Sequence, residues 1–441
     1  MIVYMFWLQL LVVLAAIFAG ARIGGIGLGI LGGLGLGVLT FIFHLEPTSP
    51  PIDVMLMIAA VTTAAGTLQA AGGMDYLVRL AEKALRRHPH RITFMGPIVT
   101  YLFTFCAGTG HISYSIMPII AEVSRQSGVR PERPMSIAVI ASQQAITASP
   151  ISAATVALLS LLSGASISLS QILMISVPAT FIGCMIAAFV MTKVGKELKD
   201  DPEYQKRLQD GDNLDLQIMD QDELPKGAKL SVLLFLAGVL FVVLLGSFPS
   251  MRPGWFTENG WKQLDMASSI EIVMLAAAAL IVLICRVKPD KIAKGNVFMA
   301  GTQAVISIFG IAWMGDTFFS GNMELISGSI QGMVTAAPWL FATALFLLSM
   351  LLYSQAATVR ALVPLGISLG LPAPALIAMF PAVNGYFFIP NYPTLVAAIN
   401  FDRTGTTRIG KYVLNHSFML PGLIATISAV AIGFVLAQII L

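Results

Sequence analysis

Long apolar segments alternate with short polar loops along almost the whole chain. Ten of these segments approach or exceed the length of a helix that crosses a bilayer, which is about 20 residues. The pattern predicts spans at 4–21, 25–43, 54–72, 135–162, 171–192, 230–247, 269–285, 297–314, 375–401 and 415–440. We therefore expect an all-α polytopic membrane protein with about ten transmembrane helices.

Composition supports this class. Charged residues make up only 11% of the chain, whereas soluble domains contain about 25%. The net charge of +3 is too small to indicate nucleic-acid binding. The three cysteines lie far apart in apolar segments, so we predict no metal site and no cofactor. The lipid bilayer is the expected surrounding, and we leave a homodimer open.

Landmarks in the first half of the chain recur in the second half at a nearly constant offset of 243 to 246 residues. Each pair marks either the end of an apolar run or a polar break near a proline. The pairs are 66–72 with 310–316, Pro118 with Pro364, and Pro150 with Pro393. The order is the same in both halves, which predicts an internal repeat.

Equivalent loops of the two repeats differ in charge. The loop 79–91 carries five Lys or Arg residues and its counterpart 323–338 carries none, whereas 44–53 carries none and 286–294 carries four. Because cytoplasmic loops are rich in Lys and Arg, equivalent loops should lie on opposite sides of the membrane. The repeats are therefore predicted to be inverted. This topology puts 23 of the 26 Lys and Arg residues in the cytoplasm and both termini in the periplasm.

Two further segments, 92–123 and 339–370, must start and finish on the same side. Each has two apolar arms around a small polar centre, too short for full spans, which predicts re-entrant hairpins. Polar residues also interrupt the spans 135–162 and 375–401, which we expect to be broken at the midplane. The predicted organisation is a first inverted repeat 1–192, a charged cytoplasmic linker 193–229 and a second inverted repeat 230–441.

Small polar residues gather at the hairpin centres and at the two breaks. Broken helices in transporters aim half-helix N-termini, with their partial positive charge, at anions. Proline suits the first turn of such a half-helix, so Pro150 and Pro393 are each predicted to open one. Two donor clusters related by a pseudo-two-fold match an anion with a carboxylate at each end. The candidate substrate-binding residues are Gly108, Thr109, Gly110, His111, Thr147, Ser149, Ser152, Ser354, Gln355, Thr358, Arg360, Asn391 and Thr394.

The alternative is that these residues only allow helices to pack closely, but four clusters in repeat-related positions favour binding. Arg360 is a special case because an ionisable group inside a membrane is costly. Its guanidinium is shaped for bidentate carboxylate binding. It could instead reach the periplasmic surface or pair with Asp316.

At these motifs the sequence resembles the anaerobic C4-dicarboxylate transporter (Dcu) family, from about residue 8 to the C-terminus. The matching residues are 20–26, Ala71-Gly72-Gly73-Met74-Asp75, Gly108-Thr109-Gly110-His111, 146–152, 353–357 and the quite specific 401–410. The resemblance implies exchange of fumarate, malate, aspartate and succinate across a bacterial inner membrane, with an elevator mechanism. His111 is similar to the fumarate–succinate branch and Thr358 to the aspartate-using branch. Asn391 stands where the family usually has Thr, so the preferred substrate stays open.

Three other functions remain to be weighed. A Na⁺- or H⁺-coupled organic-anion symporter could use the same architecture, because carbonyl groups at helix breaks can hold Na⁺. An intramembrane hydrolase would need Ser113 or Ser115 to work with His111, but residues two apart on a helix point away from each other. A channel would need a continuous pore rather than two opposed hairpins. We therefore expect a transporter and not an enzyme.

Overall fold

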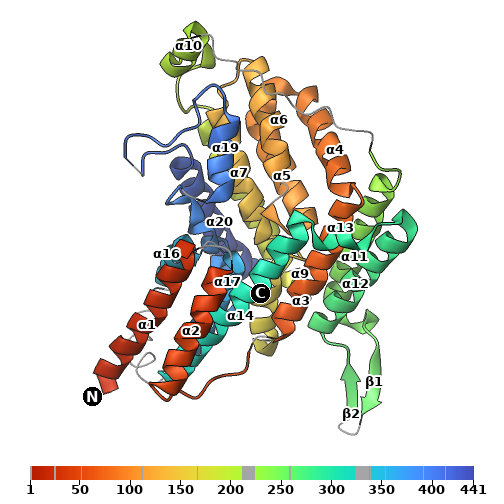
Figure 1. Ribbon diagram of the computed structural model, residues 1–441, viewed down its shortest axis with the longest axis vertical. Coiled ribbons are helices and arrows are strands. Elements are labelled where there is room, and N and C mark those ends of the chain that lie inside the picture. Colours follow the sequence, from red (N-terminus) through yellow and green to blue (C-terminus); the bar gives the residue numbers. More distant parts are fainter. Residues whose placement is uncertain are drawn as a thin grey trace.

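The computed structural model describes residues 2–23, 26–50, 52–110, 113–165, 167–210, 224–257, 260–322, 337, 339–352, 354–390, 392–412 and 414–441. Two candidate residues, His111 and Asn391, lie outside these ranges. Most of the described chain is helical (Figure 1). Helices suit long apolar segments because all their backbone hydrogen bonds are made within the segment.

The first half of the chain contains nine α-helices in the described residues, along with two single turns of 3₁₀-helix. The elements are α1 (Ile2–Ile23), α2 (Gly27–Phe41), α3 (Ile52–Ala70), α4 (Gly73–Arg87), η1 (Pro89–Arg91), α5 (Ile92–Ala107), α6 (Ser113–Gln126), α7 (Glu132–Ile146), α8 (Ala153–Leu161), η3 (Ser163–Ala165) and α9 (Leu169–Met191).

The described residues of the second half are also mostly helical. Its described elements are α11 (Ala228–Ser247), η5 (Pro249–Met251), β1 (Gly254–Thr257), β2 (Gly260–Gln263), α12 (Met266–Cys285), α13 (Pro289–Ala293), α14 (Asn296–Gly321), α16 (Trp339–Leu352), α17 (Gln355–Ser368), α18 (Ala373–Met379), η6 (Phe380–Phe387), α19 (Pro393–Phe401) and α20 (Met419–Ile440).

Among the described residues, four helices are long and apolar enough to cross a membrane, namely α9, α11, α12 and α20. The helices at residues 55–70 and Gly73–Arg87 meet at a bend of 71° and would give a fifth candidate span if the two are counted as one. The bend lies at Gly72, whose φ of +79° favours glycine. The sequence prediction of a span at 54–72 therefore captures α3 but not the helix α4 that turns away from it.

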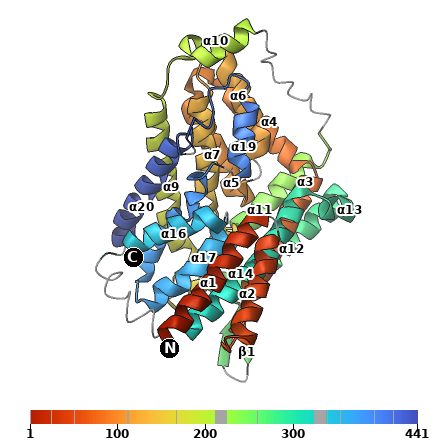
Figure 2. The ribbon, with the colours of Figure 1, turned by 60° about the vertical axis from the view of Figure 1, so that its left-hand side comes forward.

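The expectation of an all-α chain is wrong at one place. β1 and β2 form an antiparallel hairpin in which Trp255 pairs with Lys262 and Phe256 pairs with Trp261. Aromatic residues favour strands, and the connection 248–265 between α11 and α12 is long enough for two of them. The hairpin lies at the opposite end of the molecule from α10 (Pro202–Gln209), as Figures 1 and 2 both show.

The described part of the linker is also more ordered than a solvated charged loop. It forms η4 (Leu198–Asp200) and α10, and Asp201 caps α10 by accepting hydrogen bonds from the backbone N–H groups of Glu203 and Tyr204. Burial alone would raise the pKa of Asp201, but Arg130 and these N–H donors outweigh burial and lower it below its ordinary value. Arg207 donates to the Arg403 carbonyl at 3.0 Å, which ties α10 to the loop before α20.

Several helix pairs join the two halves. α9 packs along α20, α2 packs on α14, and α3 packs on α12. In the interior α17 packs on α8, and α6 packs on α19. Every one of these pairs takes one helix from each half, so the halves interlock rather than lying side by side as separate domains.

The crossing of α2 and α14 depends on glycine. A Cβ at Gly32 would lie 2.6 Å from the carbonyl carbon of Gly310 and 2.6 Å from the nitrogen of Ile311. Small residues let membrane helices approach backbone to backbone in this way. Gly33, the next residue on the same helix, has no atom within 4 Å of its Cβ position.

These neighbours give a matched pair of variants. Gly32→Ala should lower the melting temperature of the detergent-purified protein, because α2 and α14 must move apart. Gly33→Ala should leave it unchanged or raise it, because alanine favours helix over glycine by about 1 kcal/mol. Equal melting temperatures for the two variants would contradict the close crossing.

Candidate functional site

Two glutamines near the end of α7 lie where the candidate segments converge. Gln143 accepts a hydrogen bond through its Oε1 from Nε2 of Gln355, at the start of α17, at 3.0 Å. A Cβ at Gly110 would lie 2.6 Å from the Nε2 of Gln143. The segment at Gly110 and the start of α17 therefore both lie against one side chain of α7.

Asn384 connects this pair to the rest of the polar interior. It is 1% exposed. Nε2 of Gln355, which donates to Gln143, also donates to the Oδ1 of Asn384, at 3.1 Å. The Nδ2 of Asn384 approaches Oε1 of Gln144 at 3.2 Å and Oγ1 of Thr147 at 3.4 Å. Gln144 in turn donates to Thr426 of α20 at 3.0 Å. We call Gln143, Gln144, Thr147, Gln355, Asn384 and Thr426 the amide cluster.

The backbone leaves the regular helix on both sides of this cluster. α7 ends at Ile146, and η6 departs from helical geometry at Asn384, with φ −102° and ψ 30°. Such irregular backbone at membrane depth is tolerated where it is buried in protein. α19 then begins at Pro393, a position that suits proline.

The expectation that Pro150 opens a half-helix is wrong, because α8 begins at Ala153. Ser152 is its N-cap and accepts a hydrogen bond from the backbone N–H of Thr155 at 3.1 Å. A serine hydroxyl satisfies a free N–H at this position, whereas proline has no side-chain acceptor. Pro150 lies two residues earlier, in the connection between α7 and α8.

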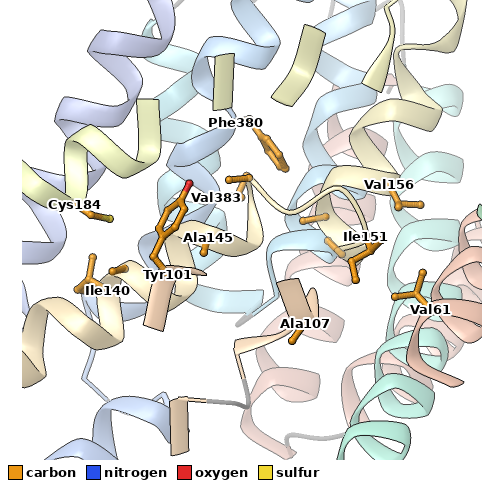
Figure 3. Packing of buried hydrophobic residues seen from close by; sticks show 14 of the residues in the cluster. Val61, Tyr101, Ala107, Ile140, Ala145, Ile151, Val156, Cys184, Phe380 and Val383 are labelled. Carbon is orange, nitrogen blue, oxygen red and sulfur yellow. The ribbon is translucent and has the colours of Figure 1, made fainter. Parts of the chain in front are cut away.

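The hydroxyl groups in the connection between α7 and α8 donate hydrogen bonds to backbone carbonyls of the protein. Thr147 donates to the Gln144 carbonyl at 2.8 Å, and Ser149 donates to the Phe105 carbonyl of α5 at 2.7 Å. Ser152 donates to the Ile146 carbonyl. A Cβ at Gly108 would lie 2.9 Å from Ile151, so α5 ends directly against the connection. Figure 3 shows Ala107 and Ile151 on these neighbouring segments.

The start of α17 is stabilised in a similar way. Ser354 is its N-cap, with its Oγ accepting from the backbone N–H of Ala357 at 3.2 Å. Thr358 donates to the Ser354 carbonyl at 2.8 Å. α17 therefore points its N-terminus, which carries partial positive charge, toward the amide cluster through Gln355.

Arg360 lies one turn further along α17 and is 7% exposed. Its Nε is buried without a hydrogen-bond partner. Among the described residues no carboxylate lies within ion-pair distance of it, although Asp316 and Asp53 are near enough to interact with it electrostatically. The guanidinium of Arg360 is therefore buried with at least one unused donor.

The structure brings together some of the predicted residues and not others. Gly108, Gly110, Thr147, Ser149, Ser152 and Gln355 surround the junction of α5, α7 and α17, and Thr109 is half-buried beside them. Ser354, Thr358 and Arg360 continue along α17. Thr394 is buried on α19, and its hydroxyl has no hydrogen-bond partner among the described residues, so no hydrogen bond links it to the amide cluster.

Sequence reasoning left Gln143, Gln144, Asn384 and Thr426 out of the candidate set. The signal was present for the first three, because an amide is rare inside an apolar segment. The donors collected here are neutral amides and hydroxyls with one guanidinium, a set suited to carboxylate binding. In the part of the chain that the structure describes, no three His, Cys, Asp or Glu residues group as metal ligands would.

The amide cluster predicts a measurable coupling. Asn384→Ala should destabilise the protein by about 1–3 kcal/mol, because Gln144 and Gln355 lose buried partners. In a double-mutant cycle, Asn384→Ala and Gln355→Ala should couple by about 0.5–3 kcal/mol, measured from unfolding in detergent. Ser168→Ala, which removes the cap of α9, shares no partner with Gln355 and should be additive with it. Additivity of Asn384→Ala with Gln355→Ala would contradict the network.

The chain is similar in sequence to several C4-dicarboxylate transporters. The chain is 47% identical over 433 residues to the C4-dicarboxylate transporter DcuA of Wolinella succinogenes, covering 98% of this chain and 99% of that protein. It is 45% identical over 434 residues to DcuA of Escherichia coli strain K12, with the same coverage. It is 41% identical over 443 residues to the anaerobic C4-dicarboxylate transporter DcuB of Escherichia coli O6:H1, covering 98% of each chain.

Solved structures share the fold at low sequence identity. The crystal structure of the YdaH transporter of Alcanivorax borkumensis matches 99% of this chain and 97% of its own, with a TM-score of 0.61 and 15% identity. MtrF of Neisseria gonorrhoeae matches 90% of this chain and 84% of its own, with a TM-score of 0.59 and 12% identity. A family model described as the anaerobic C4-dicarboxylate membrane transporter matches residues 5–441. The chain therefore belongs to the anaerobic C4-dicarboxylate membrane transporter family and is a multi-pass membrane protein.

Proposed function

We propose that this protein exchanges C4-dicarboxylates, such as fumarate, malate, aspartate and succinate, across the bacterial inner membrane. The names of its relatives support the substrate class. The observation that carries the proposal is the buried junction where the hairpin centre at Gly108–Gly110, the connection between α7 and α8, the start of α17 and the kink at Asn384 meet. These are the four segments that a pseudo-symmetric anion site requires.

Two inverted repeats account for the way the halves interlock. A pseudo-two-fold axis makes contacts reciprocal: α2 packs on α14 as α12 packs on α3, and α6 packs on α19 as α17 packs on α8. The pair α9 and α20 would lie on the axis. In this arrangement α5 and α6 form one re-entrant hairpin and α16 and α17 the other, with the breaks between α7 and α8 and before α19.

Substrate binding would use the charge of Arg360 and the neutral donors around it. A dianion must lose water to enter, and a helix end supplies only about half a charge. Arg360 would compensate one carboxylate directly. The amide cluster and the N-terminus of α17 would contribute hydrogen bonds, with hydroxyls such as Thr147 and Ser149 exchanging their internal partners for substrate oxygens. The hairpins and broken helices would move as a unit in an elevator mechanism.

Single-cysteine labelling tests the inverted topology. In a background with Cys106, Cys184 and Cys285 replaced by Ser, exposed positions are chosen from the structure. Arg87→Cys and Asp290→Cys should react only from the cytoplasm. Ser49→Cys and Leu441→Cys should react with a membrane-impermeant maleimide from the periplasm. Labelling of positions 49 and 290 from the same side would exclude inverted repeats, because their loops are repeat equivalents.

Counterflow in proteoliposomes tests the exchange itself. Vesicles loaded with succinate should take up labelled fumarate far faster than empty vesicles, because the carrier returns only when loaded. Arg360→Gln should weaken succinate binding roughly ten- to 150-fold, the loss expected for a hydrogen bond to a charged group. Binding of succinamate, the monoamide, should fall less, because glutamine can still hydrogen-bond its neutral end.

The control is Arg252→Gln, which also removes an arginine with a buried unpartnered Nε, and should leave both ligands unaffected. Equal loss of succinate and succinamate in folded Arg360→Gln would make Arg360 structural. Uptake into empty vesicles that requires a Na⁺ or proton gradient would favour a symporter over an exchanger.

A further inference from the structure

A polar cavity lies at the end of the molecule where α9 ends and α20 begins. Its volume is about 640 Å³. Three segments line it: the loop between α6 and α7, the chain just after α9, and the loop 408–417 before α20. We call it the α9–α20 pocket, and it lies outside the amide cluster.

The pocket has more positive than negative charge. Arg130, Arg408 and Lys411 line it with a single carboxylate, Glu132. Arg130 and Glu132 neutralise each other at 2.6 Å, and Arg130 also pairs with Asp201. The second Glu132 oxygen accepts from the Ser417 hydroxyl at 2.7 Å. In the described chain no carboxylate forms an ion pair with Arg408 or Lys411.

The histidine in the pocket adds no charge. His416 accepts a hydrogen bond through Nδ1 from the backbone N–H of Phe418 at 3.2 Å. Its Nε2 therefore carries the proton and donates to the Phe388 carbonyl at 3.3 Å. Both ring nitrogens are used in the neutral form, so the attraction for an anion comes from Arg408 and Lys411.

The setting of the pocket is the surface of a membrane. α9 and α20 are both apolar enough to cross a bilayer, and Leu420, which lines the pocket, is 45% exposed. Apolar side chains of the same loop, including Tyr412 and Leu414, are exposed as well. On α9, Phe189 is exposed and the Lys193 ammonium lies 5.1 Å from its ring centroid. A water-soluble anion would leave this apolar rim uncovered.

We propose that the α9–α20 pocket binds the phosphate group of an anionic phospholipid, with Arg408 and Lys411 as its counter-ions and the acyl chains along α9 and α20. Basic pockets next to membrane helices recognise anionic headgroups by this combination of charge and apolar contact. A lipid held there ties the loop 408–417 to the end of α9. The proposal depends on the membrane location of α9 and α20 and not on the transported substrate.

Native mass spectrometry of the full chain in detergent measures the binding, with dioleoyl phosphatidylglycerol as probe and dioleoyl phosphatidylcholine for comparison. Wild-type protein should retain phosphatidylglycerol preferentially. Each cation near a headgroup contributes about fivefold in affinity, so Arg408→Gln with Lys411→Gln should weaken binding roughly 30-fold. Lys411→Gln alone, at an exposed position, should weaken it about fivefold and guards against misfolding of the double variant.

The matched control is Lys288→Gln with Lys291→Gln, which removes the same charge from the exposed start of α13. It should change the affinity less than twofold. Equal loss in the two double variants would mean general attraction to anionic lipid and would overturn the site. Inorganic phosphate that displaces phosphatidylglycerol at equal concentration would overturn the lipid assignment in favour of a soluble anion.

Discussion

The buried amides of Gln143, Gln144, Gln355 and Asn384 connect irregular backbone segments of the two halves inside an apolar bundle. A polar side chain that is buried away from water must find hydrogen-bond partners within the protein. Here the kink at Asn384 and the end of α7 share the same set of side chains. The breaks in the two halves therefore stabilise each other.

This requirement explains why the candidate site is assembled from both halves of the chain. Gln355 and Asn384 come from the second half, whereas Gln143 and Gln144 come from the first. Each half supplies partners for the amides of the other: Gln143 accepts from Gln355, Gln144 accepts from Asn384, and Gln144 donates to Thr426. The interlocked packing of α17 on α8 and of α6 on α19 then follows from bringing the breaks together.

The sequence predicted the membrane class well, because long apolar segments have few alternatives. It also pointed to Gly110 and Gln355, which lie beside Gln143 in the structure, since small and polar residues are unusual in such segments. It did not group the amides of Gln143 and Asn384 into one cluster, because the pairs Gln143–Gln355 and Gln144–Asn384 are each more than 200 residues apart in the chain. Pro150 was misread for a local reason: proline marks a break, but the cap that starts α8 is the hydroxyl of Ser152.

The contacts made by loop residues were the other feature that the sequence did not predict. The charges of the linker indicate solvent exposure, yet Asp201 is buried against Arg130, a residue 71 positions earlier. A charge pattern predicts on which side of the membrane a loop lies. It does not predict which ion pairs the loop forms, since these depend on which loops the helix bundle brings together. The same limit hid the α9–α20 pocket, whose lining residues come from segments far apart in the sequence.

The distribution of charge suits a carrier that must release what it binds. Neutral hydrogen bonds each contribute only about 0.5–1.5 kcal/mol net, so a site made mostly of amides and hydroxyls holds an anion without trapping it. A cluster of several cations at the centre would bind a dianion more strongly and would itself be costly to bury when empty. Arg360 alone keeps that cost to a single group, with Asp316 and Asp53 near enough to offset part of it. In the proposed site, one buried cation among neutral donors would thus be a compromise between attracting a dicarboxylate and letting it leave.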